Sequence, residues 1–128
     1  MAPLVLIVDD DALLCSMLQI ALKRNGYESH VALSGKEALE YLENNRVSLL
    51  LLDVMMADMD GFGVMQRIRE HPVYHDLPII MLTAHADPVT RQRGLAFGAN
   101  DYLVKPVTPD RIVESIHAVM PTPDSDPL

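Results

Sequence analysis

Charged and hydroxyl side chains directly follow four apolar segments of this chain. The side chains concerned are those of Asp9, Asp10, Asp53, Thr83 and Lys105. A single carboxylate after one strand carries little information. If the four segments are parallel strands of one sheet, however, their carboxyl ends share an edge, and open α/β sheets bind ligands at that edge. The pattern therefore predicts a site that combines carboxylates, a hydroxyl and an ammonium.

Three carboxylates in a small space repel one another and raise one another's pKa, so they require either protonation or a bound cation. Mg²⁺ or Mn²⁺, held by one or two carboxylates, water and a phosphate oxygen, would meet that requirement. A carboxylate such as Asp53, flanked by a metal ion and Lys105, can accept a phosphoryl group as a nucleophile. The metal ion, Lys105 and the Thr83 hydroxyl would stabilise the negative charge of the transition state. These residue types therefore favour phosphoryl transfer.

Strand patterns alternate with helical patterns along the sequence, which indicates βα units and a parallel sheet. The expected strands are residues 4–8, 28–32, 47–53, 78–82 and 101–104. Helices are expected over 12–25, from 34 onward, over 61–70, and from 87 to 98 and 108 to 120. Together they form a (βα)5 doubly wound five-stranded parallel sheet of the α/β class. Right-handed crossovers permit few strand orders, and the flavodoxin-like order 2-1-3-4-5 places Asp9 and Asp10 beside Asp53.

Capping residues and apolar spacing define the helices. Ser34 opens a capping box, while Asp87 and Thr108 each precede a proline, which is typical of a helix start. In the first helix five apolar residues are expected to face the core: Leu14, Met17, Leu18, Ala21 and Leu22. Cys15 is expected on the partly exposed side of this helix. Asp11 is a better candidate for a solvated helix cap than for a metal ligand.

Length and composition indicate one globular domain, expected over residues 1–120, followed by a proline- and aspartate-rich tail or linker at 121–128 that is expected to be disordered. No apolar run reaches the ~18–20 residues of a membrane span, and the start has no basic segment typical of a signal peptide. The single cysteine fits a reducing cytoplasm. A net charge of -8 argues against direct binding to nucleic acid or to an anionic membrane.

Five short motifs, in this order and at this spacing, resemble one protein family. They lie at residues 7–11 (IVDDD), 52–56 (LDVMM), 59–61 (MDG), 81–84 (MLTA) and 98–106 (GANDYLVKP). Each motif alone is weak, but the set is specific. Over about residues 4–120 the chain resembles the receiver domains of two-component response regulators, the CheY-like family.

The resemblance implies a role for each matching residue of the acidic site. Asp53 corresponds to the phosphoacceptor, and Asp10 to a direct Mg²⁺ ligand. Asp9 would act on the metal largely through water, and Met55 would supply its backbone carbonyl. Asp53 itself would be a further metal ligand.

The resemblance also assigns the residues that respond to phosphorylation. Thr83 matches the hydroxyl that senses the phosphoryl group, and Lys105 matches the lysine that pairs with it. Tyr102 matches the family's switch aromatic, although a half-buried aromatic at the sheet edge is the alternative interpretation. The bond between Lys105 and Pro106 is the family's usual place for a cis peptide.

The implied function is a phosphorylation-controlled switch and not an enzyme acting on an external substrate. A sensor histidine kinase or phosphotransfer protein would donate the phosphoryl group, and the domain would assist its own phosphorylation and slow dephosphorylation. An output partner or domain would read the face formed by the fourth helix, fifth strand and fifth helix. Ala57 departs from the family's usual proline, which puts the rigidity of that loop in doubt. His85 lies where phosphoryl lifetime is influenced, and no lifetime is predicted from it.

Two other classes of function remain open at this point. A haloacid-dehalogenase-type phosphatase would need a second aspartate where this chain has Met55, and a cap domain. A phosphorylation-independent interaction module would keep the fold without accepting a phosphoryl group. The intact acidic pair, Thr83 and Lys105 argue against this class. A calcium loop at 58–61 is rejected because Arg67 stands where its final glutamate would be. Zinc binding by His71 and His75 is rejected because Pro72 breaks the helix between them.

Overall fold

In the computed structural model, residues 2–55, 60–84 and 87–120 are described, and they form ten alternating elements. The strands are β1 (Leu4–Val8), β2 (Glu28–Ala32), β3 (Leu49–Asp53), β4 (Ile79–Thr83) and β5 (Asp101–Val104). The helices are α1 (Ala12–Arg24), α2 (Gly35–Asn44), α3 (Gly61–Arg69), α4 (Pro88–Ala96) and α5 (Pro109–Val119). All strand pairs are parallel, in the order β2-β1-β3-β4-β5. The predicted fold class and strand order are confirmed.

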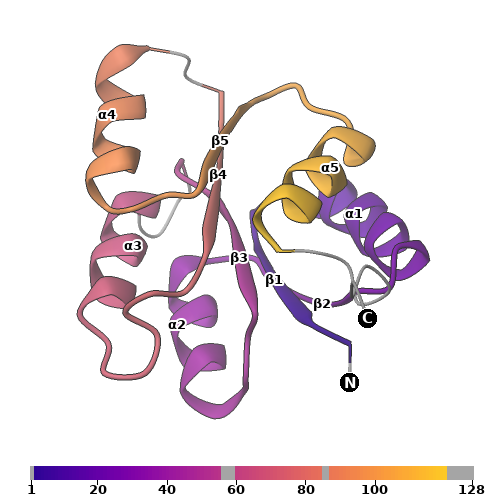
Figure 1. Ribbon diagram of the computed structural model, residues 1–128, viewed down its shortest axis with the longest axis horizontal. Helices are drawn as coiled ribbons and strands as arrows, with labels where there is room; N and C mark the ends of the chain where they lie inside the picture. Colours follow the sequence, from indigo (N-terminus) through magenta and orange to yellow (C-terminus); the bar gives the residue numbers. More distant parts are fainter. Residues whose placement is uncertain (1, 56–59, 85–86, 121–128) are drawn as a thin grey trace.

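The sheet separates two hydrophobic clusters, each covered by its own helices (Figure 1). Helices α1 and α5 pack on one face, and α2 and α3 pack on the other, where α4 also lies (Figure 1). All five residues of β3 are buried because this strand is central and covered on both faces. That burial explains its uninterrupted apolar sequence. Within the described ranges, no helix has the length and apolarity needed to cross a membrane.

The register of the sheet brings the strand ends together. Val8 of β1 is opposite Leu52 of β3, and Asp53 is opposite Leu82 of β4. Thr83 closes β4 opposite Val104 of β5. The residues that follow these positions therefore meet at one edge, as the sequence predicts.

Some details of the predicted elements were wrong, among them the bounds of β4, which runs over Ile79–Thr83 and not over 78–82. Met17 is 46% exposed, whereas Cys15 is only 2% exposed and takes the inward position. Cys15, Leu18 and Leu22 are spaced three and four residues apart, so they share one helical face, and Met17 falls on its flank. The predicted start of β3 at 47 is also two residues early, since Val47 is buried in the preceding loop.

The predicted helix caps are confirmed. The side chains of Asp11, Ser34, Asp87 and Thr108 each accept a hydrogen bond from the backbone N–H three residues later. Asp60 does the same for α3. Asp11 is thus engaged as the cap of α1, which satisfies one of the free N–H groups at that helix end.

Gly61 permits a close backbone approach beside the end of β3. Its N–H donates to the Val54 carbonyl at 2.8 Å. A Cβ at this position would lie 2.5 Å from the Val54 Cα and 2.9 Å from the Asp53 carbonyl oxygen. Any side chain here would displace the backbone that carries Asp53, so glycine is needed to position the strand end.

Candidate functional site

Lys105 joins the ends of β1 and β3. Its Nζ lies 2.8 Å from Asp9 Oδ2 and 3.4 Å from Asp53 Oδ2. Backbone groups hold the other carboxylate oxygens, since the Asp11 N–H donates to Asp9 Oδ1 at 2.9 Å and the Met55 N–H donates to Asp53 Oδ1 at 3.0 Å. Asp9 is fully buried and Asp53 is 5% exposed. Both carboxylates are therefore fixed in place by an ammonium and a backbone donor.

Asp10 completes a group of three carboxylates. Asp9, Asp10 and Asp53 each offer an oxygen within 4.8 Å of the others, and Asp10 is exposed. One ammonium does not neutralise three carboxylates, so this group retains net negative charge. Oxygen donors at this spacing suit a hard divalent cation. The residues present therefore fit Mg²⁺ or Mn²⁺.

The titration behaviour of the site reflects this crowding. Burial raises the pKa of Asp53 above its ordinary value; the Met55 N–H opposes that rise and the charge of Asp9 adds to it. Burial disfavours the charge of Lys105, but its hydrogen bonds and charge interactions with Asp9 and Asp53 outweigh burial and raise the pKa of Lys105. Lys105 thus remains cationic at neutral pH, whereas burial and the charge of Asp9 disfavour the ionised form of Asp53.

Thr83 and Tyr102 lie on neighbouring strands beside this group. Thr83 is fully buried at the end of β4, and its carbonyl accepts the Lys105 N–H at 2.7 Å. Tyr102 is half-buried on β5, opposite Met81, and packs against the core cluster on the α2 and α3 side of the sheet. The peptide bond between Lys105 and Pro106 is cis. The fold thus brings the described candidates other than Tyr102 to one edge, with Met55 exposed at its rim, whereas Tyr102 lies two residues before the end of β5.

Two residues that hold β5 against its helix were not found from the sequence. Asp101 accepts the Tyr102 N–H at 2.8 Å, and its other oxygen accepts the Ser115 hydroxyl. Ser115 is buried on α5. An aspartate at a strand start gives no sequence signal for such a contact.

Cys15 lies directly behind the site. Its Sγ donates to the Asp9 carbonyl at 3.5 Å. Burial, together with the charges of Asp9 and Asp11, raises the pKa of the Cys15 thiol from 9.0 to about 11. Only the thiolate is nucleophilic, so at pH 8 without divalent metal we expect iodoacetamide to alkylate Cys15 at least ~100-fold more slowly than in the urea-unfolded chain. Comparable rates in the two states, measured by mass spectrometry, would contradict this placement.

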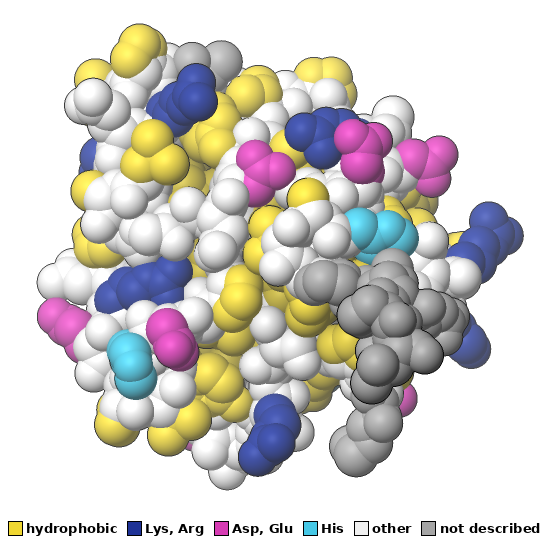
Figure 2. All heavy atoms as spheres, in the orientation of Figure 1, with side chains coloured by type: hydrophobic (Ala, Val, Ile, Leu, Met, Phe, Trp, Pro, Cys, Tyr) yellow, Lys and Arg dark blue, Asp and Glu magenta, His cyan; other side chains and the backbone are white. Residues whose placement is uncertain are grey.

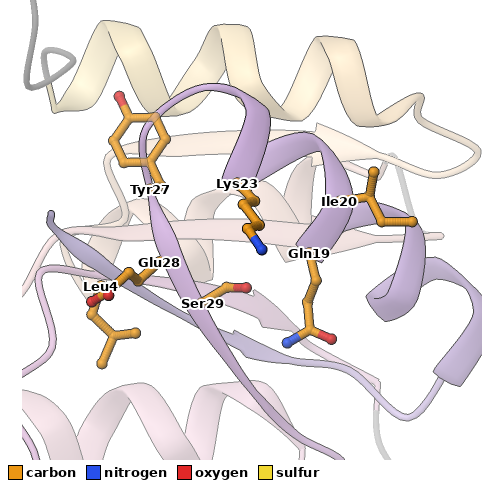
Figure 3. Close-up of a pocket in the computed structure, with 7 residues that line it drawn as sticks. All are labelled: Leu4, Gln19, Ile20, Lys23, Tyr27, Glu28 and Ser29. Atoms are coloured by element: carbon orange, nitrogen blue, oxygen red, sulfur yellow. The ribbon is translucent and has the colours of Figure 1, made fainter.

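A groove of about 420 Å³ adjoins the site on the side of Lys105. Its walls include Asp11 and Leu14 from the start of α1, and Pro106 and Val107 after β5. A second groove, of about 580 Å³, lies between α1 and the edge strand β2 (Figure 3). It is lined by Gln19, Ile20 and Lys23 from α1 and by residues of β1 and β2, and contains none of the strand-end carboxylates. The first groove therefore borders the site at Lys105, whereas the second lies away from the strand ends.

Comparison with known proteins agrees with this geometry. The family described as "Response regulator receiver domain" matches residues 5–117. The chain belongs to this family. It is thus a receiver domain of a response regulator in two-component signalling, and the predicted family is confirmed.

Similar receiver proteins come from several organisms. The chain is 40% identical over 116 residues to the transcriptional regulatory protein SrrA of Staphylococcus aureus, covering 91% of this chain and 47% of SrrA. It therefore spans about half the length of the curated relatives it matches. Among solved structures, the chemotaxis protein CheY4 of Vibrio cholerae has a TM-score of 0.88 at 34% identity, covering 94% of this chain and 100% of CheY4. A putative response regulator of Chloroflexus aurantiacus has a TM-score of 0.86 at 39% identity, covering 93% and 98%.

Some of the predictions made for this receiver concern positions that the structure does not describe. Ala57, where the family usually has proline, and His85, which follows Thr83 by two residues, lie outside the described residues. The expected tail at 121–128 also lies outside them. These three expectations stay as predictions.

Proposed function

We propose that this receiver accepts a phosphoryl group on Asp53 from a sensor histidine kinase or a histidine phosphotransfer protein. The observation that carries the proposal is the shared contact of Lys105 with Asp9 and Asp53 inside a group of three carboxylates. A structural ion pair needs one carboxylate and one ammonium. The surplus of buried negative charge here suits a site that binds a cation and a phosphoryl group.

In the proposed step, a carboxylate oxygen of Asp53 forms a bond to phosphorus, and the phosphorus–nitrogen bond of a phosphohistidine breaks. The leaving imidazole takes up a proton as it departs. The Lys105 ammonium, 3.4 Å from Asp53 Oδ2, offsets the charge on the transferred oxygens. When bound, Mg²⁺ or Mn²⁺ would offset further charge, with Asp10, Asp53 and the Met55 carbonyl as ligands and Asp9 acting through water.

Thr83 and Tyr102 would carry the change to an output partner or domain. The Thr83 side chain would move so that its hydroxyl binds a phosphoryl oxygen. The Tyr102 ring would then fill the space that Thr83 vacates. The region of α4 shows hydrophobic and basic side chains at the surface (Figure 2), and Val89 and Leu95 of this helix are 67% and 57% exposed. Phosphorylation can shift the conformation of this region only if the phosphoryl group interacts more favourably with one of its two conformations than with the other. The proposed output face therefore comprises α4, β5 and α5.

The test is intact-protein mass after incubation with acetyl phosphate, with and without Mg²⁺. We expect one phosphoryl adduct on the wild type that requires Mg²⁺ and is absent from Asp53→Asn. Asp60→Asn is the matched control, because Asp60 is exposed and asparagine caps a helix equally well.

Rapid hydrolysis could hide the adduct, so binding of beryllofluoride, a stable phosphoryl mimic, is followed in parallel by fluorine NMR. An adduct on Asp53→Asn would place the acceptor elsewhere. Absence of both the adduct and beryllofluoride binding in the wild type would reject phosphorylation and leave an interaction module.

A further inference from the structure

Helix α4 is attached unevenly to the rest of the molecule. Gly94 is its only buried residue, and a Cβ at that position would overlap the sulfur of Met81 on β4. In its first turn Pro88, Val89 and Arg91 are exposed. Among the residues that the structure describes, the side-chain contacts of α4 lie toward its C-terminal end.

Arg69, the last residue of α3, binds four backbone carbonyls in two separate segments. Its Nε donates to Phe97 O at 2.7 Å and its Nη2 to Gly98 O at 3.1 Å, both at the C-terminal end of α4. Its Nη1 donates to Leu77 O at 2.8 Å and to His75 O at 3.1 Å, just before β4. The planar guanidinium matches this arrangement, which a single ammonium cannot reproduce.

The position of Arg69 is also favourable electrostatically. Carbonyl groups at a helix C-terminus lack partners within the helix and carry partial negative charge, so a cation stabilises them. Burial lowers the pKa of Arg69, and nearby Asp76 opposes that effect. Since a guanidinium stays protonated at neutral pH even when its pKa falls, Arg69 keeps its charge.

Two further contacts hold the same end of α4. The Arg93 guanidinium lies 4.0 Å from the centroid of the Phe62 ring on α3, and the rings of Phe62 and Phe97 stack with centroids 6.3 Å apart. Gly98 turns the chain with φ +77°, and its N–H bonds to the Leu95 carbonyl. The C-terminal end of α4 is thus fixed to α3 and to the segment just before β4.

We propose that Arg69 is a positioning residue that fixes the C-terminal end of α4, so that the helix pivots about this end when the state of the site changes. The N-terminal end of α4 follows Thr83 along the chain, at the edge where the carboxylates lie. The pivot rests on the proposed function, because phosphorylation at Asp53 is the change that would move the N-terminal end of α4. The fixation of the helix end by Arg69 does not rest on it.

The first test uses amide hydrogen exchange of the unliganded protein in wild type, Arg69→Met, Arg69→Lys and the control Arg67→Met. The amides of Phe97, Gly98 and Ala99 bond to carbonyls of α4 and report on its end. We expect them to exchange about tenfold faster in both Arg69 variants, relative to the sheet amides of the same protein. Arg67 is exposed on the same helix, so its loss should leave the three amides unchanged. An equal increase at all amides, or none at these three, would reject a local role for Arg69.

The second test adds Mg²⁺ and beryllofluoride and follows amide chemical shifts. In the wild type we expect changes at Val89, Thr90 and Arg91 while Phe97 and Gly98 stay unchanged. In Arg69→Lys, which keeps the charge, the changes should extend to the C-terminal end. Equal changes at both ends of the wild-type helix would overturn the pivot. If no residue responds, including Thr83, and acetyl phosphate also gives no adduct, phosphorylation at Asp53 is rejected, and with it the pivot, while fixation by Arg69 is still decided by the first test.

Discussion

Replacement of Lys105 by methionine is expected to lower the free energy of unfolding by about 3 kcal/mol at pH 7 in EDTA. Asp9 is fully buried, and the variant leaves its Oδ2 without the ammonium that lies 2.8 Å away. Methionine keeps most of the apolar stem, so the loss reports on the charge. The value is at the low end for a buried ion pair because the Lys105 side chain is 23% exposed.

Urea unfolding measures this change, and Lys23→Met is the control because Lys23 is exposed on α1. The control should stay within about 0.5 kcal/mol of the wild type. Mg²⁺ should restore part of the stability of Lys105→Met by supplying positive charge to the same carboxylates. The variant should also form the acetyl phosphate adduct about 100-fold more slowly, the usual cost of removing one charge-stabilising donor. A loss of stability below about 1 kcal/mol would show that Asp9 does not depend on this ammonium.

The candidate site follows from the sequence because parallel strands impose it. Once Asp9, Asp53 and Lys105 are placed directly after strands of one parallel sheet, the strand order alone brings them together. The separation of Lys105 from Asp53 and Asp9, 52 and 96 positions along the chain, is then irrelevant. The predicted bounds of β1, β2 and β5 are also confirmed.

Other features depend on packing that no local pattern encodes. Cys15 faces inward because α1 presents that side to β1 and α5, and an apolar count alone favours Met17 equally. Arg69 binds carbonyl groups, which every residue carries, so nothing in the sequence around Phe97 or Gly98 identifies its partners. Contacts between strand ends can therefore be predicted, whereas a side chain bound to distant backbone requires the structure.

Asp53→Asn is expected to act in the opposite direction to Lys105→Met and to raise the free energy of unfolding by about 1 kcal/mol at pH 7 in EDTA. Repulsion from Asp9 and Asp10 disappears, and the lost attraction to Lys105 offsets part of this gain. Asparagine keeps an oxygen for the Met55 N–H. If so, the residue that carries the proposed chemistry destabilises the fold, as is common at functional sites.

The pH dependence of this difference in unfolding free energy identifies its cause. Burial, together with Asp9, raises the pKa of Asp53 in the folded protein above its unfolded value of 3.8. The folded state then binds this proton more tightly than the unfolded chain, so the wild type loses stability relative to Asp53→Asn as pH rises from the unfolded pKa through the folded pKa. Urea unfolding from about pH 4 to about pH 7 should show the difference between the two proteins growing with pH. A difference that stays constant over this range would mean that packing, and not the buried charge of Asp53, separates them.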